Sequence, residues 1–243
     1  MNDFLVVIPA YNEERNIEFV IHSLKNLKLP IDIIVINDGS VDDTLAIAKK
    51  CGVPVITHPT NLGYLAAVQT GFKFAGSKNY SYVIYFDGDG QHDPIYIKDI
   101  MAEIEKDEND VVIGSRFLES NCMKISKSKL MVVKLFRSII YQITKKKITD
   151  PTSGFKAYKE KVYRRFIDSN NFNYDLPDSN FIIDILLQNY KIVEIPVNMF
   201  DRQHGKSKIH NPGVKPLIYL AQTLLSIFIV TVKSKLSQRG DLQ

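Results

Sequence analysis

Apolar runs of strand length recur along this chain, and each is followed by residues whose apolar side chains have helical spacing. The runs are Phe4–Ile8, Ile31–Ile36, Val53–Thr57, Tyr82–Phe86 and Val111–Ile113. Strands that alternate with helices in this way indicate a mostly parallel sheet with helices on both faces, which is the α/β class. The 243 residues suffice for one substantial α/β core, so we expect one domain with a C-terminal extension.

The fourth apolar run leads directly into a segment rich in aspartate and glycine. Asp87 and Asp89 are separated by one glycine, and Gln91 follows two residues later. Open α/β sheets hold ligands at the carboxyl ends of their strands, and oxygen ligands suit Mg²⁺ or Mn²⁺ carrying phosphates. We therefore expect a divalent-ion site here, with a plain polar turn as the alternative. Asp93 and Pro94 predict the N-cap and first residue of the next helix.

A second polar segment follows the second apolar run. Asp38 lies there at the end of a predicted strand and before a glycine, so we expect its carboxylate to reach a ligand. Ser40, with Asp43 three residues later, resembles a capping box that would open the next helix. The segment therefore predicts one ligand-binding residue beside one helix start.

The formal net charge of +4 is unevenly distributed. Residues 123–165 hold 13 Lys and Arg against 2 Asp and Glu, so this stretch should face something anionic. Within it, Lys129–Tyr141 predicts a basic amphipathic helix that suits an anionic lipid surface. The alternative is a helix packed on the core with a solvated basic face. The basic residues alternate with aliphatic rather than aromatic side chains, which argues against nucleic-acid binding.

The C-terminal residues 211–243 predict a further amphipathic helix. No charge occurs between Lys215 and Lys233, which leaves 17 residues, at the lower limit of about 17 to 25 for a membrane span. Because polar residues form a stripe along this segment, we expect it to lie at a membrane interface or dock on a partner. The N-terminus lacks a signal-peptide pattern and the two cysteines are isolated, so we expect a cytoplasmic protein.

Three motifs, each after a predicted strand, together resemble family 2 glycosyltransferases of the GT-A fold. They are Pro-Ala-Tyr-Asn-Glu-Glu at 9–14, Asn-Asp-Gly-Ser at 37–40 and Asp-Gly-Asp-Gly-Gln at 87–91. Later segments look like the polyprenyl-phosphate branch of that family, typified by dolichol-phosphate mannosyltransferase. They are Gly-Ser-Arg-Phe at 114–117, Asp-Pro-Thr-Ser-Gly-Phe at 150–155, Glu-Ile-Pro-Val at 194–197, Arg202, and Gly-Lys-Ser at 205–207. The resemblance implies a GT-A domain over 1–210, with a donor part at 1–117 and an acceptor part at 118–210.

The resemblance also implies roles for single residues. The residues that it places at the nucleotide-sugar donor are Pro9, Tyr11, Glu13, Asp38, Asp87, Arg116 and Lys206. The metal ligands that it implies are Asp87, Asp89 and Gln91, and the catalytic residues are Asp150, Arg202 and Asp89. The predicted acceptor contacts are Ser153, Lys127, Lys129 and Asp178; Lys127 and Lys129 rest on charge and location alone. For Asp178, a plain N-cap is the alternative.

We expect an inverting, metal-dependent glycosyltransferase that moves a sugar from a UDP- or GDP-sugar to a polyprenyl phosphate. It would act peripherally on the inner face of the membrane, in cell-surface glycan synthesis, and a small membrane partner protein is a further hypothesis. Two alternatives stay open, namely transfer to a sugar hydroxyl of a lipid-linked oligosaccharide or wall polymer, and a non-catalytic nucleotide-sugar binding subunit. A hydroxyl acceptor needs a general base within about 3 Å, whereas a phosphate is already largely dianionic at neutral pH. Asp150 is the candidate in either case, as base or as positioning residue.

Overall fold

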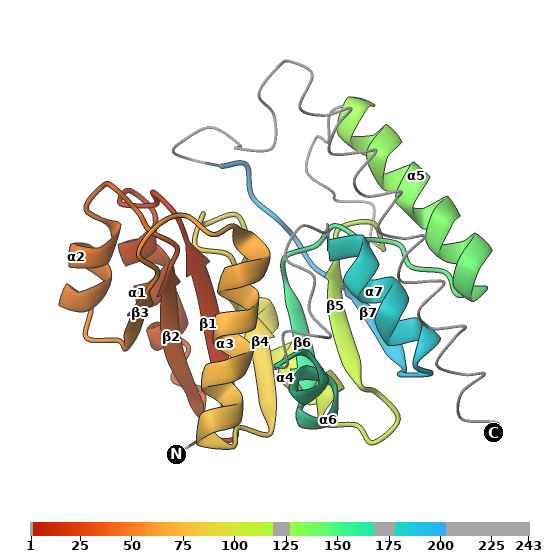
Figure 1. Ribbon diagram of the computed structural model, residues 1–243, viewed down its shortest axis with the longest axis horizontal. Helices are drawn as coiled ribbons and strands as arrows, with labels where there is room; N and C mark the ends of the chain where they lie inside the picture. The colour runs from red at the N-terminus through yellow and green to blue at the C-terminus, as the bar shows by residue number, and fades with distance from the viewer. Residues whose placement is uncertain (1, 119–126, 168–177, 203–243) are drawn as a thin grey trace.

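A computed structural model of the chain describes residues 2–118, 127–167 and 178–202, and the described strands form one seven-stranded sheet (Figure 1). The strands are β1 (Phe4–Ala10), β2 (Ile31–Asn37), β3 (Val55–Thr57), β4 (Tyr82–Tyr85), β5 (Val111–Ser115), β6 (Lys156–Lys159) and β7 (Ile192–Pro196). The α-helices are α1 (Ile17–Asn26), α2 (Thr44–Lys50), α3 (Tyr64–Lys78), α4 (Ile97–Ile104), α5 (Lys127–Thr144), α6 (Glu160–Tyr163) and α7 (Asp178–Leu187). The described residues also form two short 3₁₀ helices, η1 (Pro94–Tyr96) and η2 (Arg164–Phe166).

The strand order is β3-β2-β1-β4-β6-β5-β7. Among the described strands, four pairings are parallel, and only β6 runs antiparallel, between β4 and β5. The predicted α/β class with a mostly parallel sheet is therefore confirmed, and each of the five apolar runs contributes a strand. The register aligns Ala10 at the end of β1 with Asn37 at the end of β2, so the polar segments after these strands emerge at one edge.

Helices cover both faces of the sheet (Figure 1). On one face, α1, α2 and α4 bury apolar side chains against the sheet, and α1 contributes Ile17, Val20, Ile21 and Leu24. On the other face, α3, α5, α6 and α7 pack on a second apolar cluster.

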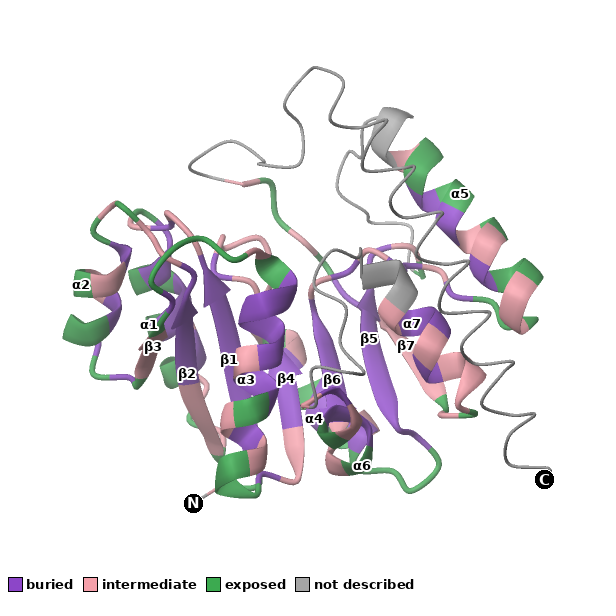
Figure 2. Cartoon of the chain, in the orientation of Figure 1, coloured by how far each residue is buried: buried purple, intermediate pink, exposed green. Residues whose placement is uncertain are grey.

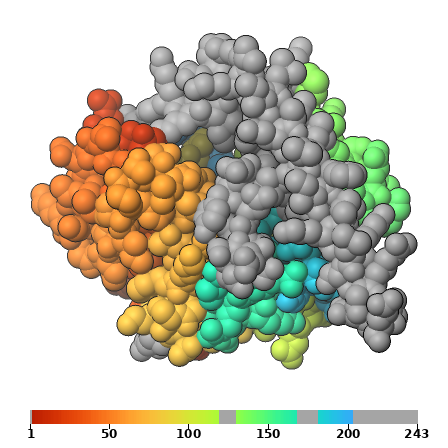
Figure 3. Space-filling view, in the orientation of Figure 1, coloured from red at the N-terminus to blue at the C-terminus, as the bar shows by residue number. Residues whose placement is uncertain are grey.

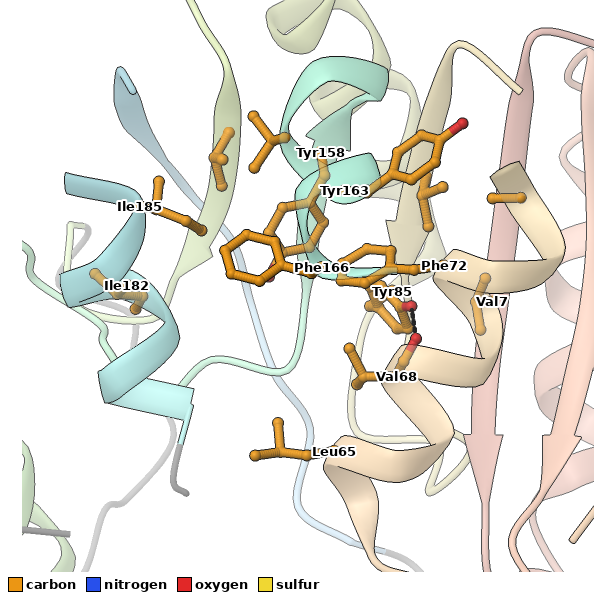
Figure 4. Packing of buried hydrophobic residues seen from close by; sticks show 14 of the residues in the cluster. Val7, Leu65, Val68, Phe72, Tyr85, Tyr158, Tyr163, Phe166, Ile182 and Ile185 are labelled. Atoms are coloured by element: carbon orange, nitrogen blue, oxygen red, sulfur yellow. Dashed lines mark hydrogen bonds between the residues drawn. The ribbon is translucent and has the colours of Figure 1, made fainter. Parts of the chain in front are cut away.

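The second cluster is built around an aromatic side chain of α3 (Figure 4). The Phe72 ring stacks on Tyr163 with centroids 5.8 Å apart and forms a T-shaped pair with Tyr85, with centroids 5.2 Å apart. Each such fully buried apolar side chain contributes about 1.5 to 3 kcal/mol through its removal from water. This packing fixes α3 on the sheet and so fixes the loop that leads into it.

Helix α5 confirms the predicted basic amphipathic segment and packs with one side on the protein. Its inner side buries Val133, Phe136 and Ile140, while Met131 and Leu135 are exposed on the outer side (Figure 2). The helix reaches the surface at the opposite end of the molecule from α2 (Figure 3). Across the described residues, we find no helix whose length and hydropathy would allow it to cross a bilayer.

Two predicted helix starts have different outcomes. The Asp93 carboxylate accepts a hydrogen bond from the Ile95 amide at 3.1 Å and Pro94 begins η1, so this predicted N-cap is confirmed. The capping box at Ser40 is wrong, because its hydroxyl instead accepts from the Asn12 amide at 2.9 Å. Ser40 therefore joins the loops that follow β1 and β2. The predicted helix within 211–243 lies outside the described residues.

Candidate active site

The loops after β1, β2 and β4 meet at one edge of the sheet. The Gly88 amide donates to the Pro9 carbonyl at 3.3 Å, and the Asp38 amide donates to the Ala10 carbonyl at 2.8 Å. These backbone contacts bring together the three motifs that the sequence separates by about 25 to 50 residues each. Pro9 is buried at the end of β1, and Tyr11 is half-buried just beyond it.

Asp87 is held in place from two sides. Its Oδ2 lies 3.3 Å from Nε2 of His92, whose buried ring packs between Phe86 and Phe155. On another side, the backbone of Gly154 approaches so closely that an added Cβ would lie 2.0 Å from Oδ2. The second oxygen, Oδ1, is buried and has no hydrogen-bond partner within the described parts of the chain. A buried carboxylate oxygen without a partner is unusual and fits a site for a cation.

The two carboxylates after β4 have pKa values shifted in opposite directions. Burial raises the pKa of Asp87, but the hydrogen bond and charge of His92 and the charge of Lys156 outweigh it, so this pKa lies below its ordinary 3.8. Burial, and next the negative charge of Asp87, hold the pKa of Asp89 above its ordinary value. A divalent cation would relieve both the burial of charge and the mutual repulsion. The residues present therefore fit the predicted ion.

The chain after β7 returns across the end of β4. The Phe200 amide donates to the Gln91 carbonyl at 2.7 Å, and the Gln91 side-chain amide donates to the Phe200 carbonyl at 3.2 Å. This pairing carries Arg202 to Glu13, with which its guanidinium forms an ion pair. The positive charge of Arg202 also bears on Asp89, where it lowers the pKa. The structure thus brings together two predicted site residues that are 189 positions apart.

Asp38 contacts its own protein through both carboxylate oxygens. The four donors are His58 Nδ1 at 2.7 Å, the Leu62 amide at 2.9 Å, the Gly63 amide at 2.9 Å and Asn61 Nδ2 at 3.0 Å. Asp38 therefore fixes the loop that precedes α3, and the first residue of that helix, Tyr64, hydrogen-bonds to Asp87. A contact between Asp38 and the donor stays a prediction, and this positioning of the loop was not foreseen from the sequence.

Asp150 and Arg116 form a buried bidentate ion pair. Arg116 Nε lies 2.6 Å from Asp150 Oδ2, and its Nη2 lies 2.7 Å from Oδ1. The Arg116 backbone amide and the Thr152 hydroxyl also donate to this carboxylate, which is 0 % exposed. The predicted donor contact Arg116 and the predicted catalytic residue Asp150 are therefore partners, and their charges neutralise each other.

A glutamate on β7 holds the loop that carries Asp150. The amides of Thr149 and Asp150 donate to the two carboxylate oxygens of Glu194 at 2.6 and 2.8 Å. Burial raises the pKa of Glu194, against the opposing effect of these amides. Further along the same loop, the buried Ser153 hydroxyl accepts from the Phe155 amide at 3.2 Å. Ser153, a predicted acceptor contact, thus lies inside the turn that places Gly154 against Asp87.

The remaining predicted residues are placed only by their backbone or lie outside the described chain. Lys127 and Lys129 belong to the first turn of α5, and α7 begins at Asp178, but the side chains of these three are not described. Lys206 lies outside the described residues. The roles of these four residues therefore stay predictions.

Three residues that build the site received no role from the sequence. His92 and Gly154 each stand inside a recognised motif or directly beside one, and Glu194 begins another. The signal was present, because a glycine inside a polar loop often marks a close backbone approach. What the sequence lacks is the partner, since Asp87 and Gly154 are 67 positions apart and meet only in the folded sheet.

An α/β sheet that gathers paired carboxylates and an arginine at its strand ends defines the class of GT-A glycosyltransferases. The family model for glycosyl transferase family 2 matches residues 5–171, and the chain belongs to this family. As predicted, it is a glycosyltransferase.

Among curated relatives, the polyprenol monophosphomannose synthase of Mycolicibacterium smegmatis is 25% identical over 226 residues, which cover 88% of this chain and 84% of that protein. The dolichol-phosphate mannosyltransferase of Pyrococcus furiosus is 30% identical over 220 residues, covering 84% of this chain and 58% of that one. These names confirm the predicted resemblance to the polyprenyl-phosphate branch.

Solved structures share the fold. Glucosyl-3-phosphoglycerate synthase from Mycobacterium tuberculosis, crystallised with Mn²⁺, uridine diphosphate and phosphoglyceric acid, superposes with a TM-score of 0.68 at 19% identity. The match covers 92% of this chain and 78% of that one. At this identity, the likeness is evidence for the GT-A fold and not for a shared substrate.

Proposed function

We propose that this glycosyltransferase moves one sugar from a nucleotide sugar to a polyprenyl phosphate, with Mg²⁺ or Mn²⁺ held by Asp87, Asp89 and Gln91. The relatives named for polyprenol and dolichol phosphate support the acceptor class. The unpartnered Oδ1 of Asp87 beside Asp89, and a structural neighbour crystallised with Mn²⁺ and uridine diphosphate, support the donor and the ion. A transfer assay with a panel of UDP- and GDP-sugars decides which nucleotide the donor carries.

The burial of Asp150 and its ion pair with Arg116 are the observations on which the proposed acceptor rests. A hydroxyl acceptor requires a base within hydrogen-bonding reach, yet Asp150 is buried and both its oxygens bind Arg116. A phosphate monoester has a second pKa of about 6, so most of it is already nucleophilic at neutral pH. Among the open alternatives, the geometry therefore favours the phosphate acceptor, and we assign Asp150 a positioning role.

The reaction sets different tasks for the residues at the strand ends. Asp87, Asp89 and Gln91 would hold the ion, which when bound would supply positive charge to the departing diphosphate. His92 and Gly154 keep Asp87 in one orientation, and Asp38 keeps the start of α3 beside it. Arg202 exchanges its contact with Glu13 for the donor phosphates. An oxygen of the acceptor phosphate then bonds to the anomeric carbon from the face opposite the nucleotide, while the bond from that carbon to the nucleoside diphosphate breaks, so the configuration of the anomeric carbon inverts.

We place this reaction at the cytoplasmic face of a membrane, with the protein bound peripherally and its product used for surface glycans. The exposed apolar side chains Met131, Val132 and Leu135 on α5, with the neighbouring lysines 145–147, support contact with an anionic lipid surface. A small membrane partner protein remains a separate hypothesis. Purification of an active enzyme alone from detergent extracts would refute it.

The donor half of the proposal is tested by removing one carboxylate at a time. Asp89→Asn should abolish Mn²⁺-dependent binding of the nucleoside diphosphate in calorimetry, whereas Asp93→Asn, which changes only the cap of η1, should leave it within about twofold. EDTA should abolish binding to the wild-type protein. Tight binding that persists in EDTA would contradict the assigned ion site, and binding without any transfer would favour the non-catalytic alternative.

A further inference from the structure

Arg137 on α5 is half-buried, and the protein satisfies its guanidinium only in part. Its Nε donates to the Thr149 carbonyl at 2.6 Å, and its guanidinium lies over the Phe117 ring at 4.3 Å. One terminal nitrogen, Nη2, is buried and has no hydrogen-bond partner among the residues that the structure describes. A charged donor buried without a partner loses its hydration without compensation, so native proteins rarely keep one without a reason.

The guanidinium of the neighbouring Arg116, in contrast, has a carboxylate partner. Arg116 also lies over the Phe117 ring, at 5.7 Å, but Asp150 binds it bidentately. For Arg137, no carboxylate in the described part of the chain takes that place. Arg137 therefore carries a positive charge beside Thr149, next to Asp150 in its loop, and this charge is available to an anion.

We propose that Arg137 binds the phosphate of the acceptor, an inference that rests on the proposed function. The guanidinium presents N–H groups in a fixed plane that matches phosphate oxygens, and an acceptor dianion supplies the negative charge that no described residue places there. The donor diphosphate is the other source of such oxygens. We favour the acceptor because Arg137 contacts the loop of Asp150 from α5 at Thr149, whereas the donor residue Asp87 meets that loop at its other end, at Gly154.

Arg137 also connects α5 to the loop that carries Asp150. On α5, the exposed Met131 and Leu135 lie on the outer side, and Arg137 reaches inward to Thr149. Glu194 holds the amide of Thr149, and Arg137 holds its carbonyl. An acceptor whose chain remains at the outer side of α5 would thus meet the loop with its phosphate at Arg137.

The test compares Arg137→Gln and Arg137→Lys with Lys134→Gln, a matched change at an exposed position of the same helix. Steady-state transfer to a short-chain polyprenyl phosphate in detergent gives separate KM values for acceptor and donor. Loss of one charged hydrogen bond predicts an acceptor KM raised about tenfold or more in Arg137→Gln, with a donor KM within about twofold of wild type. Arg137→Lys should be intermediate, because lysine keeps the charge and loses the planar geometry. Lys134→Gln should resemble wild type.

Several results would overturn the assignment. A raised donor KM in Arg137→Gln would place the guanidinium at the donor, and a fall in kcat with an unchanged acceptor KM would leave Arg137 only the structural contact to Thr149. A circular-dichroism melt of each variant identifies a protein that fails to fold. If Arg137→Gln fails to fold, Arg137→Lys, which retains a cation at this position, is compared with wild type instead.

A binding experiment separates failure of this inference from failure of the proposed function. Farnesyl phosphate is titrated into wild type and Arg137→Gln, and inorganic phosphate into both as a second probe. Farnesyl phosphate binding that weakens about tenfold or more in the variant supports the phosphate site even if no sugar transfer to polyprenyl phosphate occurs. Equal binding of farnesyl phosphate by both proteins overturns it even if transfer is observed. A difference with inorganic phosphate alone would indicate a general anion site and would also overturn the acceptor assignment.

Discussion

Because Gly154 has no side chain, its backbone can pack against the carboxylate of Asp87, which is 67 positions earlier in the sequence. Its backbone lies so close to Asp87 Oδ2 that an added methyl group would occupy the same space, at 2.0 Å. We expect Gly154→Ala to displace Asp87 from the position that His92 and Tyr64 define. The affinity for a nucleoside diphosphate in the presence of Mn²⁺ should then fall at least about tenfold, measured by calorimetry.

Gly76→Ala, on α3, is the control for this change. Its Cβ would also make a tight contact, at 2.5 Å, but with the end of the flexible Ile167 side chain and away from Asp87. We expect nucleotide affinity within about twofold of wild type in this variant. Equal losses in both variants would show that general destabilisation, and not the place of Asp87, is responsible.

The Asp150–Arg116 pair predicts a stability effect that a catalytic base would lack. Removing one partner of a buried ion pair leaves an uncompensated charge, which typically costs about 3 to 5 kcal/mol. Asp150→Ala and Arg116→Ala should each lower the free energy of unfolding by that order in urea denaturation. The double variant should lose less than the sum of the two, because the partners interact directly. Loss of activity in Asp150→Ala with unchanged stability would instead support a base acting on a hydroxyl acceptor.

At the scale of elements, β7 contributes to the site through Glu194, and this contact has a pH dependence. Burial raises the pKa of this carboxyl above its ordinary 4.5 in the folded protein. As pH rises past 4.5, the unfolded chain releases this proton before the folded protein does, so stability falls until the folded pKa is passed. Relative to Glu194→Gln, the wild-type protein should therefore be most stable below pH 4.5 and lose this advantage as pH rises.

Urea unfolding of both proteins between pH 4 and 7 measures this difference. The matched control is Glu160→Gln, since Glu160 is an exposed carboxylate that pairs with Arg164 on the surface. Its difference from wild type is measured over the same pH range for comparison. A stability advantage of wild type over Glu194→Gln that grows with pH would contradict a raised pKa of Glu194, and would mean that the two amides dominate over burial.

Strands and helices could be predicted where a short stretch of sequence contains their whole apolar pattern. The runs that became β1, β2 and β4 are apolar because both faces of a parallel sheet are covered, and α1 has its apolar stripe. Strand β6 (Lys156–Lys159) was missed because lysines begin and end it, and β7 because Glu194 interrupts it. Both strands acquire their pairing from partners that are distant in sequence, which periodicity does not report.

The same limit applies to the site as a whole. The carboxylates after β4 were predictable from their place at a strand end, whereas the ion pair of Arg202 with Glu13 depends on how the chain returns after β7. The family resemblance placed Asp150 and Arg116 in the site but not against each other. Contacts that decide the chemistry thus arise from tertiary structure, even where the residues themselves are recognisable.

For the whole molecule, the outer side of α5 should bind anionic membranes. Met131 is 69 % exposed on this helix, and Lys145, Lys146 and Lys147 are exposed just beyond it. We expect Met131→Asp to lower the fraction that sediments with anionic vesicles several-fold, since a carboxylate opposes both insertion and charge attraction. Added salt should weaken wild-type binding. Phe19→Asp, at a 62 % exposed position of α1 on the other face of the sheet, should have no such effect, and an equal effect would contradict this orientation.

Transfer of a sugar to polyprenyl phosphate is tested most directly with the purified protein and a panel of radiolabelled UDP- and GDP-sugars. Each donor is offered with Mn²⁺ or with EDTA, and the acceptor is either undecaprenyl phosphate or a lipid-linked sugar. We predict Mn²⁺-dependent label on undecaprenyl phosphate from one donor. Label that appears only on the lipid-linked sugar would contradict the proposed acceptor, and would support Asp150 as a general base.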